Sequence, residues 1–512
     1  MAWKTSWLHR FAPLLLLPLA INAIAQQAPQ SLARDAALVN RVTWGATPAE
    51  LERARNMGID HYLREQLRPA RQDNLPAEIQ RRIDALSISQ QSDDAARAIQ
   101  ITLRQQSRKL PEDEKFAANR KAHQMSLARA AEVNERAVLR ALYTPHQLQD
   151  QMTWFWMNHF NVDFQKGDVG IFLSQYEDNA IRPHALGKFR DLLAATMRSP
   201  SMLIYLDNTQ NMAGKINENY ARELMELHTL GAGGGYSQND VQELARILTG
   251  LGISNSLEPP KIKRELLAQV VQQGYFLFNP ARHDYGSKVF LGHAIAGAGM
   301  QEVEQAADLL ARNPATAKFI SKKLAAYFAG EAPPASLVDK MSRTFLEKDG
   351  DISATLQTLF GSPEFAASLK TGVFKDPVHY FYSSMRMTYN GLPPIINAKV
   401  GVNLLKRLGQ PLNQHLTPDG YPLSQSDWSG SGQMTVRFEI ANAIASSPQS
   451  FYRNSPDDRP ANVPRPPNLL AANDGNGLFS MMSTRTRDAI EQAKSIPIAN
   501  TYLLASPEFM RR

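Results

Sequence analysis

The chain has 512 residues, of which 43% are hydrophobic and 21% charged, and its formal net charge is +7. This composition is typical of a globular protein, and the length allows two or three domains or one large domain with extensions. The charge is too diluted along the chain to indicate nucleic-acid binding. The absence of cysteine excludes disulfides, thiolate catalysis, Cys-ligated zinc and iron–sulfur clusters. A metal would need His, Asp, Glu, Asn or backbone oxygen ligands.

The first 25 residues are typical of a secretory signal peptide. Lys4 and Arg10 precede an apolar run, and Ala23-Ile24-Ala25 offers a small-residue cleavage site before Gln26. The run is too short and too interrupted by proline to span a membrane. No later run approaches about 18 apolar residues. The sequence therefore predicts a periplasmic or secreted protein, cleaved near Ala25–Gln26 and without a membrane span in the mature chain.

Capping signals and helical periodicity predict that most of the remaining chain is α-helical. Thr47, Pro48 and Glu50 form a capping box with proline at the first helical position, and Gly58 is placed to end that helix. The Gln-, Arg- and Ala-rich stretch 76–142 predicts two or three amphipathic helices, interrupted near Ser92 and at Pro111. Further helices are predicted over 148–160, 176–197, 217–231, 241–248, 299–312, 315–329, 335–348 and 351–360, and in a block beyond 376.

The best strand candidates lie at 275–278 and within 282–292, separated by a turn at Asn279-Pro280. We therefore expect a mainly α protein, a large multi-helix globular array with a small β-hairpin insertion near 275–292. The predicted organisation is a signal peptide at 1–25, a helical core domain at 36–375, and a C-terminal helical region at 376–512 with a proline-rich crossing at 454–470.

The most informative stretch is 205–231, which ends in the predicted helix 217–231. At 100° per residue, Glu223 and Glu226 fall on a polar arc, whereas His228 falls in the middle of an apolar arc. Taken alone, the polar arc is also typical of a solvated face with i,i+4 ion pairs. His228 alone is also typical of a hydrogen-bonded core residue. Histidines in other distinctive motifs favour a functional site.

Those other motifs come from separate parts of the chain. Asn158-His159 lies in the aromatic segment 154–160, which indicates a buried amide and imidazole that need partners. His184 lies among basic residues, and His283-Asp284 lies at the tip of the predicted hairpin. The predicted catalytic residues are Asp207, Asn219, Arg222, Glu223, Glu226 and His228; the predicted substrate-binding residues are Trp156, Asn158, Arg190, Tyr236 and Trp428; the predicted metal ligands are His159, His184, His283 and Asp284.

Several long motifs are specific enough to compare with known families. They are Arg41 with 44–50, 152–160, 184–193, 217–236, 283–288, 418–428 and 506–509. These motifs resemble those of the bacterial domain-of-unknown-function 1800 family over residues 36–512. The resemblance implies a large, exported, mainly helical protein and names no activity. Genes of this family often neighbour a family similar to sulfatases and alkaline phosphatases, which implies a sulfatase-like exported partner.

Three functions remain open. The first is an enzyme with a buried His/carboxylate site, a hydrolase or oxidoreductase that holds a divalent metal through His, Asp and Glu. Against a zinc enzyme, no His-Glu-x-x-His motif occurs, and Glu226 lies about 160° around the helix from His228. The second is a metal-free glycan hydrolase with Glu223 and Asp207 as acid and base and tryptophans as stacking surfaces. The third is a non-catalytic scaffold or maturation partner of the sulfatase-like protein. A serine-hydrolase elbow and a phosphate-binding loop are both missing.

Overall fold

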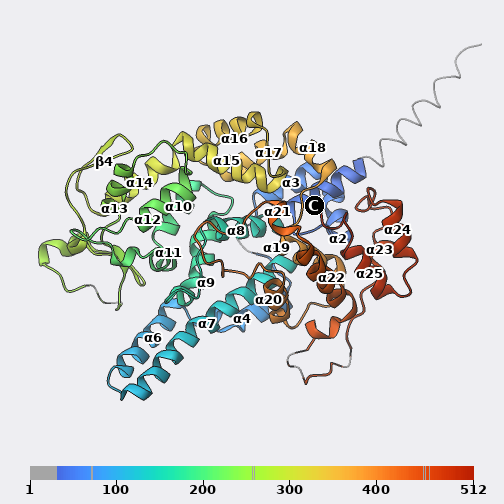
Figure 1. Ribbon diagram of the computed structural model, residues 1–512, viewed down its shortest axis with the longest axis horizontal. Helices are drawn as coiled ribbons and strands as arrows, with labels where there is room; N and C mark the ends of the chain where they lie inside the picture. The colour runs from blue at the N-terminus through green and yellow to red at the C-terminus, as the bar shows by residue number, and fades with distance from the viewer. Residues whose placement is uncertain are drawn as a thin grey trace, which may run out of the picture.

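The protein is mainly helical with two small antiparallel sheets, as the sequence predicts. Figure 1 shows a computed structural model that describes residues 31–70, 73–256, 258, 260–453, 455, 457–460 and 462–512. The predicted signal peptide lies outside these residues. Within them, no helix combines the length and the apolar character that crossing a bilayer requires.

Four of the N-terminal helices, α4, α5, α6 and α8, pack against one long helix, α7. Residues 31–42 are helical. The elements that follow are α2 (Pro48–Met57), α3 (Ile59–Leu67), α4 (Ala77–Asp84), α5 (Ser87–Gln90), α6 (Asp93–Ser107), α7 (Glu112–Tyr143) and α8 (Gln147–His159). Thr47 caps α2 as predicted, because its hydroxyl accepts the Glu50 N–H at 3.2 Å, and Gly58 ends the helix with φ +83°. The Glu50 carboxylate does not complete the capping box and instead accepts from Arg53 at 3.0 Å and from the Tyr62 hydroxyl at 2.8 Å. In Figure 1, α6 and α7 extend together as an antiparallel pair away from the rest of the molecule.

The central segment alternates short helices of different types. Its elements are η1 (Val169–Phe172), α9 (Leu173–Gln175), η2 (Tyr176–Ile181), η3 (Arg182–His184), α10 (Phe189–Met197), α11 (Pro200–Tyr205), η4 (Asn208–Gln210), α12 (Asn219–Glu223), η5 (Leu224–Thr229) and α13 (Gln238–Ile247). The helix predicted over 217–231 is α-helical only in α12, and η5 is a π-helix. The wider turn is closed by the Leu230 N–H, which donates to the Met225 carbonyl at 2.8 Å, and by the Thr229 hydroxyl, which donates to the Leu224 carbonyl at 2.7 Å.

The β insertion is present near the predicted position, but its pairing differs from a single hairpin. Its elements are β1 (Leu251–Ile253), η6 (Arg264–Gln269), β2 (Val271–Gln273), β3 (Phe276–Phe278), η7 (Pro280–Arg282), β4 (Lys288–Phe290) and β5 (His293–Ile295). β3 lies between β1 and β2, with Leu251 and Val271 both opposite Phe278, while β4 pairs with β5. The segment between β3 and β4 instead binds α13 and α14 through side chains, which keeps β4 from pairing with β3.

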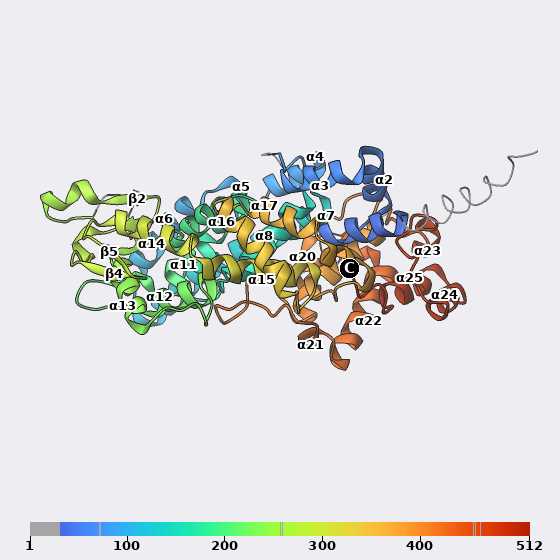
Figure 2. The ribbon, with the colours of Figure 1, turned by 90° about the horizontal axis from the view of Figure 1, so that it is seen from above.

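The C-terminal half is again helical. Its elements are α14 (Met300–Ala311), α15 (Pro314–Ala329), α16 (Ala335–Glu347), α17 (Ile352–Phe360), α18 (Pro363–Thr371), α19 (Pro377–Tyr389), α20 (Ala398–Arg407), α21 (Gln425–Trp428), α22 (Ser431–Ser446), η8 (Pro448–Phe451), α23 (Leu469–Ala472), α24 (Thr484–Glu491) and α25 (Ile496–Leu504). Helices α14 to α17 match the predicted spans. Figure 2 shows the molecule as elongated, with the β insertion and α23–α25 at opposite ends.

Two large clusters of apolar side chains form the core. The first draws its buried members from residues 36–369, and the second combines residues 378–510 with Trp44, Ile79, Ile83 and 138–142. Helix α7 contributes to both, through Val133 to the first and Val138 to the second. A boundary at residue 375 therefore separates most of the two clusters, although N-terminal residues complete the second one.

Candidate functional site

A pair of buried histidines lies at the centre of the candidate site. His159 ends α8 and is 2% exposed, and its Nε2 lies 3.0 Å from the His228 carbonyl oxygen. Because a carbonyl only accepts hydrogen bonds, Nε2 carries the proton and Nδ1 is left as an acceptor. Nδ1 lies 2.9 Å from Nζ of Lys323 in α15, which therefore donates to it. Burial, with help from Lys323 and His228, holds the pKa of His159 well below its usual range, so this imidazole is neutral.

His228 is fully buried in η5, and neither of its ring nitrogens has a hydrogen-bond partner among the described residues. Its ring packs 4.9 Å from that of Phe160 and 5.9 Å from that of His159, measured between centroids. Burial, followed by the charge of Lys323, lowers its pKa to about 3. An unsatisfied buried polar group costs about 1–3 kcal/mol and is uncommon in native proteins. The unsatisfied ring of His228 therefore destabilises the folded protein, and packing alone does not explain why a histidine occupies this position.

Lys323 connects these histidines to the surface. It is half-buried, its ammonium lies 5.6 Å from the Phe319 ring centroid, and burial lowers its pKa to about 8 although Asp419 opposes the shift. The sequence-based prediction missed this residue. A signal was present, because Phe319, Lys323 and Tyr327 are spaced by four residues and place one lysine on an aromatic helix face.

Two carboxylates without fixed partners lie on α12 and η5, and η5 packs against α15, the helix that carries Lys323. Glu223 and Glu226 are half-buried, and neither side chain forms a hydrogen bond or ion pair in the part of the chain that the structure describes. Burial raises the pKa of Glu223, and the charges of Glu226 and Asp419 raise it further. Glu226 and Glu223 also act on Tyr236. Burial is the main reason that the pKa of this tyrosine is raised, and the charges of the two glutamates raise it further. These groups therefore share one electrostatic environment.

Asp419, also missed from sequence, is held near this cluster by a loop bound to α8. The Asn158 amide donates to the Tyr421 carbonyl at 2.9 Å, and its oxygen accepts the Tyr421 N–H at 2.7 Å. Gly420 has φ +74°, and a Cβ there would lie 2.0 Å from the Asn158 carbonyl oxygen, so only glycine fits. Asn158 thus positions the loop, and Trp428 supports it by donating from Nε1 to the Pro422 carbonyl at 2.9 Å.

Other predicted site residues are occupied by structural contacts. Trp156 is fully buried and donates from Nε1 to the Ala185 carbonyl at 2.9 Å. Arg190 pairs with both Glu304 and Asp308 at 2.8 Å, which ties α10 to α14. The remaining contacts are Asp207 with Lys166 at 2.8 Å, Arg222 with Glu218 at 2.9 Å, and the Asn219 amide with the Leu206 carbonyl at 3.1 Å.

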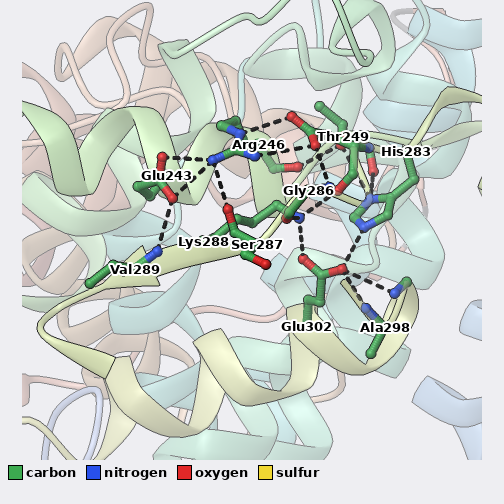
Figure 3. Close-up of polar contacts among 12 residues, drawn as sticks. Glu243, Arg246, Thr249, His283, Gly286, Ser287, Lys288, Val289, Ala298 and Glu302 are labelled. Atoms are coloured by element: carbon green, nitrogen blue, oxygen red, sulfur yellow. Dashed lines mark hydrogen bonds and ion pairs between the residues drawn. The ribbon is translucent and has the colours of Figure 1, made fainter. Parts of the chain in front are cut away.

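His283 and Asp284 belong to a separate network that joins the β insertion to α13 and α14. Figure 3 shows His283, Lys288 and Glu302 within it. Glu302 is fully buried and accepts from His283 Nε2 at 2.9 Å, from Lys288 Nζ, and from the backbone N–H groups of Ala298 and Gly299. Burial alone would raise the pKa of Glu302, but the His283 and Lys288 hydrogen bonds lower it overall.

The two members of the predicted His-Asp pair have different partners. His283 Nδ1 lies 2.8 Å from the Thr249 carbonyl oxygen, and its Nε2 lies 2.9 Å from a carboxylate oxygen of Glu302. Asp284 instead binds the guanidinium of Arg246 at 2.8 and 3.3 Å. The closed hydrogen bonds of this network are those of a structural element.

The four predicted metal ligands are therefore not brought together. His159 lies beside His228, His283 and Asp284 lie in the Glu302 network, and His184 is half-buried in η3, where burial lowers its pKa. Among the described residues, no group of three or more His, Asp or Glu side chains could hold a metal ion. The residues that the structure does gather are His159, His228, Glu223, Glu226, Lys323 and Asp419.

The fold and this cluster define a mainly helical protein in which Asp419 acts on both an unpaired glutamate and Lys323, and Lys323 is bonded to one of two buried neutral histidines. The sequence matches the family model described as "Protein of unknown function (DUF1800)" over residues 37–511. The chain belongs to that family, as its motifs predict. No curated protein and no solved structure matches it.

Proposed function

We propose that the chain is an exported enzyme in which Glu223, Glu226 and Lys323 form an acid–base site. The observation that carries the proposal is the Lys323–His159 hydrogen bond, in which a cation is held against a neutral buried imidazole instead of an acid. The two glutamates nearby have no fixed partner. Groups with shifted pKa values and unused hydrogen-bonding capacity are characteristic of sites where protons move.

The reaction that fits this set is hydrolysis without a metal. Glu223, whose pKa is raised, is suited to donate a proton to the leaving-group oxygen. Glu226 or Asp419 then accepts a proton from the attacking water, and Lys323 stabilises negative charge that develops on the leaving-group oxygen as its bond breaks. Glycosides are the first substrate class to test, because paired carboxylates alone can cleave them. Asp207 is not required in this scheme, since it is paired with Lys166.

The test is a screen of chromogenic glycosides and esters with the mature chain, alongside Glu223→Gln and Glu226→Gln. Loss of one catalytic carboxylate is expected to lower kcat about 100-fold or more. Glu218→Gln is the matched control, because Glu218 lies beside the same helix and is paired with Arg222; it should retain activity. Activity that a chelator abolishes, or that survives both glutamate substitutions, would reject this mechanism and return the metal-dependent hypothesis to first place.

A second candidate is a non-catalytic maturation partner of a sulfatase-like exported protein. It is favoured by the closed contacts of Arg190, Asn158 and the Glu302 network, which serve the fold. Co-purification of such a partner, unchanged by Glu223→Gln and Lys323→Met, would support this candidate over the enzyme.

A further inference from the structure

A second candidate site surrounds Lys375, in a part of the fold that the proposed enzyme site does not use. A cavity of about 270 Å³ lies between the helix at 31–42, the end of α18, residues 477–482 and the C-terminal residues 508–512. Its lining includes the apolar side chains Leu369, Met387, Leu478, Met482 and Phe509. The C-terminal residue lies beside the end of α18, because Arg512 and Val373 exchange two backbone hydrogen bonds of 2.8 Å.

Lys375 lines this cavity and has no hydrogen-bond partner for its amine among the described residues. It is 2% exposed, and its Nζ lies 3.8 Å from the centroid of the Phe509 ring. Its backbone is fixed, because the N–H donates to the Met510 carbonyl at 2.8 Å and the carbonyl accepts from Arg437 at 2.7 Å. The amine therefore has three unused donor positions in an apolar wall.

The charges around Lys375 are unbalanced. Arg437 and Arg512 are both buried and, after burial itself, are the groups that lower the pKa of Lys375. The adjacent acid, Asp376, is already bound to the backbone N–H and the Nδ1 of His379, at 2.8 and 2.9 Å. Without an acid partner the charged form of this buried amine is disfavoured, and an anion from outside the chain would stabilise it.

The acid that lines the cavity does not provide this anion. Glu508 accepts hydrogen bonds from the Ser483 N–H at 3.0 Å and from the Thr486 hydroxyl at 3.1 and 3.2 Å. These contacts lower its pKa despite its partial burial. The Glu508 carboxylate therefore binds the segment that begins α24 and does not pair with the Lys375 amine. The amine is available to bind a ligand.

We propose that this cavity binds a small apolar carboxylate, with the carboxylate on the Lys375 amine and the hydrocarbon chain against the methionine and leucine wall. Unbranched methionine side chains adapt to irregular apolar ligands. A charge-assisted hydrogen bond in a dry site is stronger than a neutral one and gives selectivity over an uncharged analogue. The volume suits a molecule of modest size, below the usual range for drug-sized ligands.

The test compares octanoate with octanol, measured by calorimetry and by thermal unfolding of the full chain at neutral pH. Octanoate should bind and raise Tm, while octanol should bind at least about tenfold more weakly, the value of one charge-assisted bond. Lys375→Met should weaken the binding of octanoate by about tenfold or more and leave the affinity for octanol unchanged. Lys370→Met removes an exposed lysine from the same cavity rim and should change octanoate affinity less than about twofold.

Folding does not limit this test, because Lys375→Met removes an unpaired buried charge and should be at least as stable as the native chain. Ala37→Phe, which fills the cavity from the helix at 31–42, gives a second variant that should lose octanoate binding. Equal affinity for octanoate and octanol, or octanoate binding that survives Lys375→Met, would overturn the proposal. Borohydride trapping of octanal on Lys375 without octanoate binding would also overturn it, in favour of a carbonyl-condensing amine.

Discussion

Lys323 and His228 show how single residues carry the argument for function. Both are polar groups on otherwise apolar helix faces, and both have a pKa lowered by burial. One retains a partner, His159, while the other has none among the described residues. Such groups cost stability in the resting protein, and an acid–base role would explain why they are there.

The lowered pKa of Lys323 can be measured by competitive labelling. Because its pKa is about 8, the amine should react with limiting acetic anhydride half-maximally near pH 8. Quantitative mass spectrometry of the labelled peptide gives the profile. Lys322, the exposed neighbour, serves as an internal reference for reagent concentration. A profile for Lys323 that rises only near pH 10 would contradict the buried arrangement with His159.

The unpaired His228 predicts a dependence of stability on pH. In the unfolded chain the imidazole titrates near 6.5, and in the folded chain near 3. Below pH 6.5 the unfolded chain thus binds a proton that the folded chain does not, so the free energy of unfolding should fall as pH decreases towards 3. In His228→Leu this contribution should disappear. At pH 7 the variant should be at least as stable, because an unsatisfied group worth about 1–3 kcal/mol is removed.

Urea unfolding of both proteins from pH 7 to pH 4 checks this prediction. His379→Leu is a contrasting variant, because His379 is buried but bonded to Asp376 at 2.9 Å, and its loss should destabilise the protein at pH 7. A His228→Leu variant that is much less stable at pH 7 would show that the imidazole has a stabilising partner.

At the scale of elements, most helices could be predicted because their signals are local. The Thr47 cap of α2 and the spans of α14 to α17 follow from residues within a few positions of each other. The π-helical turn of η5 could not, since it depends on buried side chains around Thr229 that periodicity does not report. The predicted pairing of β3 with β4 was wrong for a similar reason. Glu302, which lies outside the predicted hairpin, binds His283 and Lys288 and so determines where they lie.

The π-turn can be tested through Thr229, whose hydroxyl bonds the Leu224 carbonyl at 2.7 Å. Thr229→Val should cost about 1 kcal/mol of stability and also lower activity, because it loosens the turn that orients Glu226 and His228. Thr355→Val removes a similar bond, 2.8 Å to the Asp351 carbonyl, from the regular helix α17. It should cost the same stability and leave activity intact, and equal activity losses would argue against a role for the turn.

The Glu302 network should behave as a structural unit. Glu302→Leu leaves the buried Lys288 ammonium without its acid and His283 Nε2 without its carboxylate partner, and it is expected to cost about 3–5 kcal/mol. Adding Lys288→Met should restore part of that loss, because the unpaired ammonium is removed. Thermal unfolding of the single and double variants measures the coupling. Additive effects would contradict a shared network.

At the scale of the whole molecule, the two apolar clusters explain why domain boundaries are hard to predict from sequence. Trp44 belongs to the second cluster, and its ring lies 4.6 Å from His379 and 4.9 Å from Tyr382. Sequence composition reports that a core exists, but it does not report which distant segments share it. The same limit applies to the site. Helix periodicity identified Glu223, Glu226 and His228 as candidates. It could not show that η5 packs against α15, or that the loop of residues 413–422 brings Asp419 to the same region.

A fragment comprising residues 36–375 tests this organisation. It keeps Trp44, Ile79 and Val138 but lacks the residues that bury them, and each exposed side chain loses about 1.5–3 kcal/mol of burial. The fragment should bind a hydrophobic dye and unfold at a lower temperature than the full chain. A fragment with the full chain's Tm and no dye binding would show that the boundary at 375 separates independent domains.

The loop that carries Asp419 has one further consequence. Asparagine side chains from the helical body hold its backbone at several points: Asn134 to the Leu412 carbonyl, Asn161 to the His415 and Thr417 carbonyls, and Asn158 to Tyr421. The loop is therefore preorganised before any substrate arrives, and its ordering entropy is paid during folding. Association at this face should then proceed in a single kinetic phase, with little change in heat capacity beyond that of the surface buried.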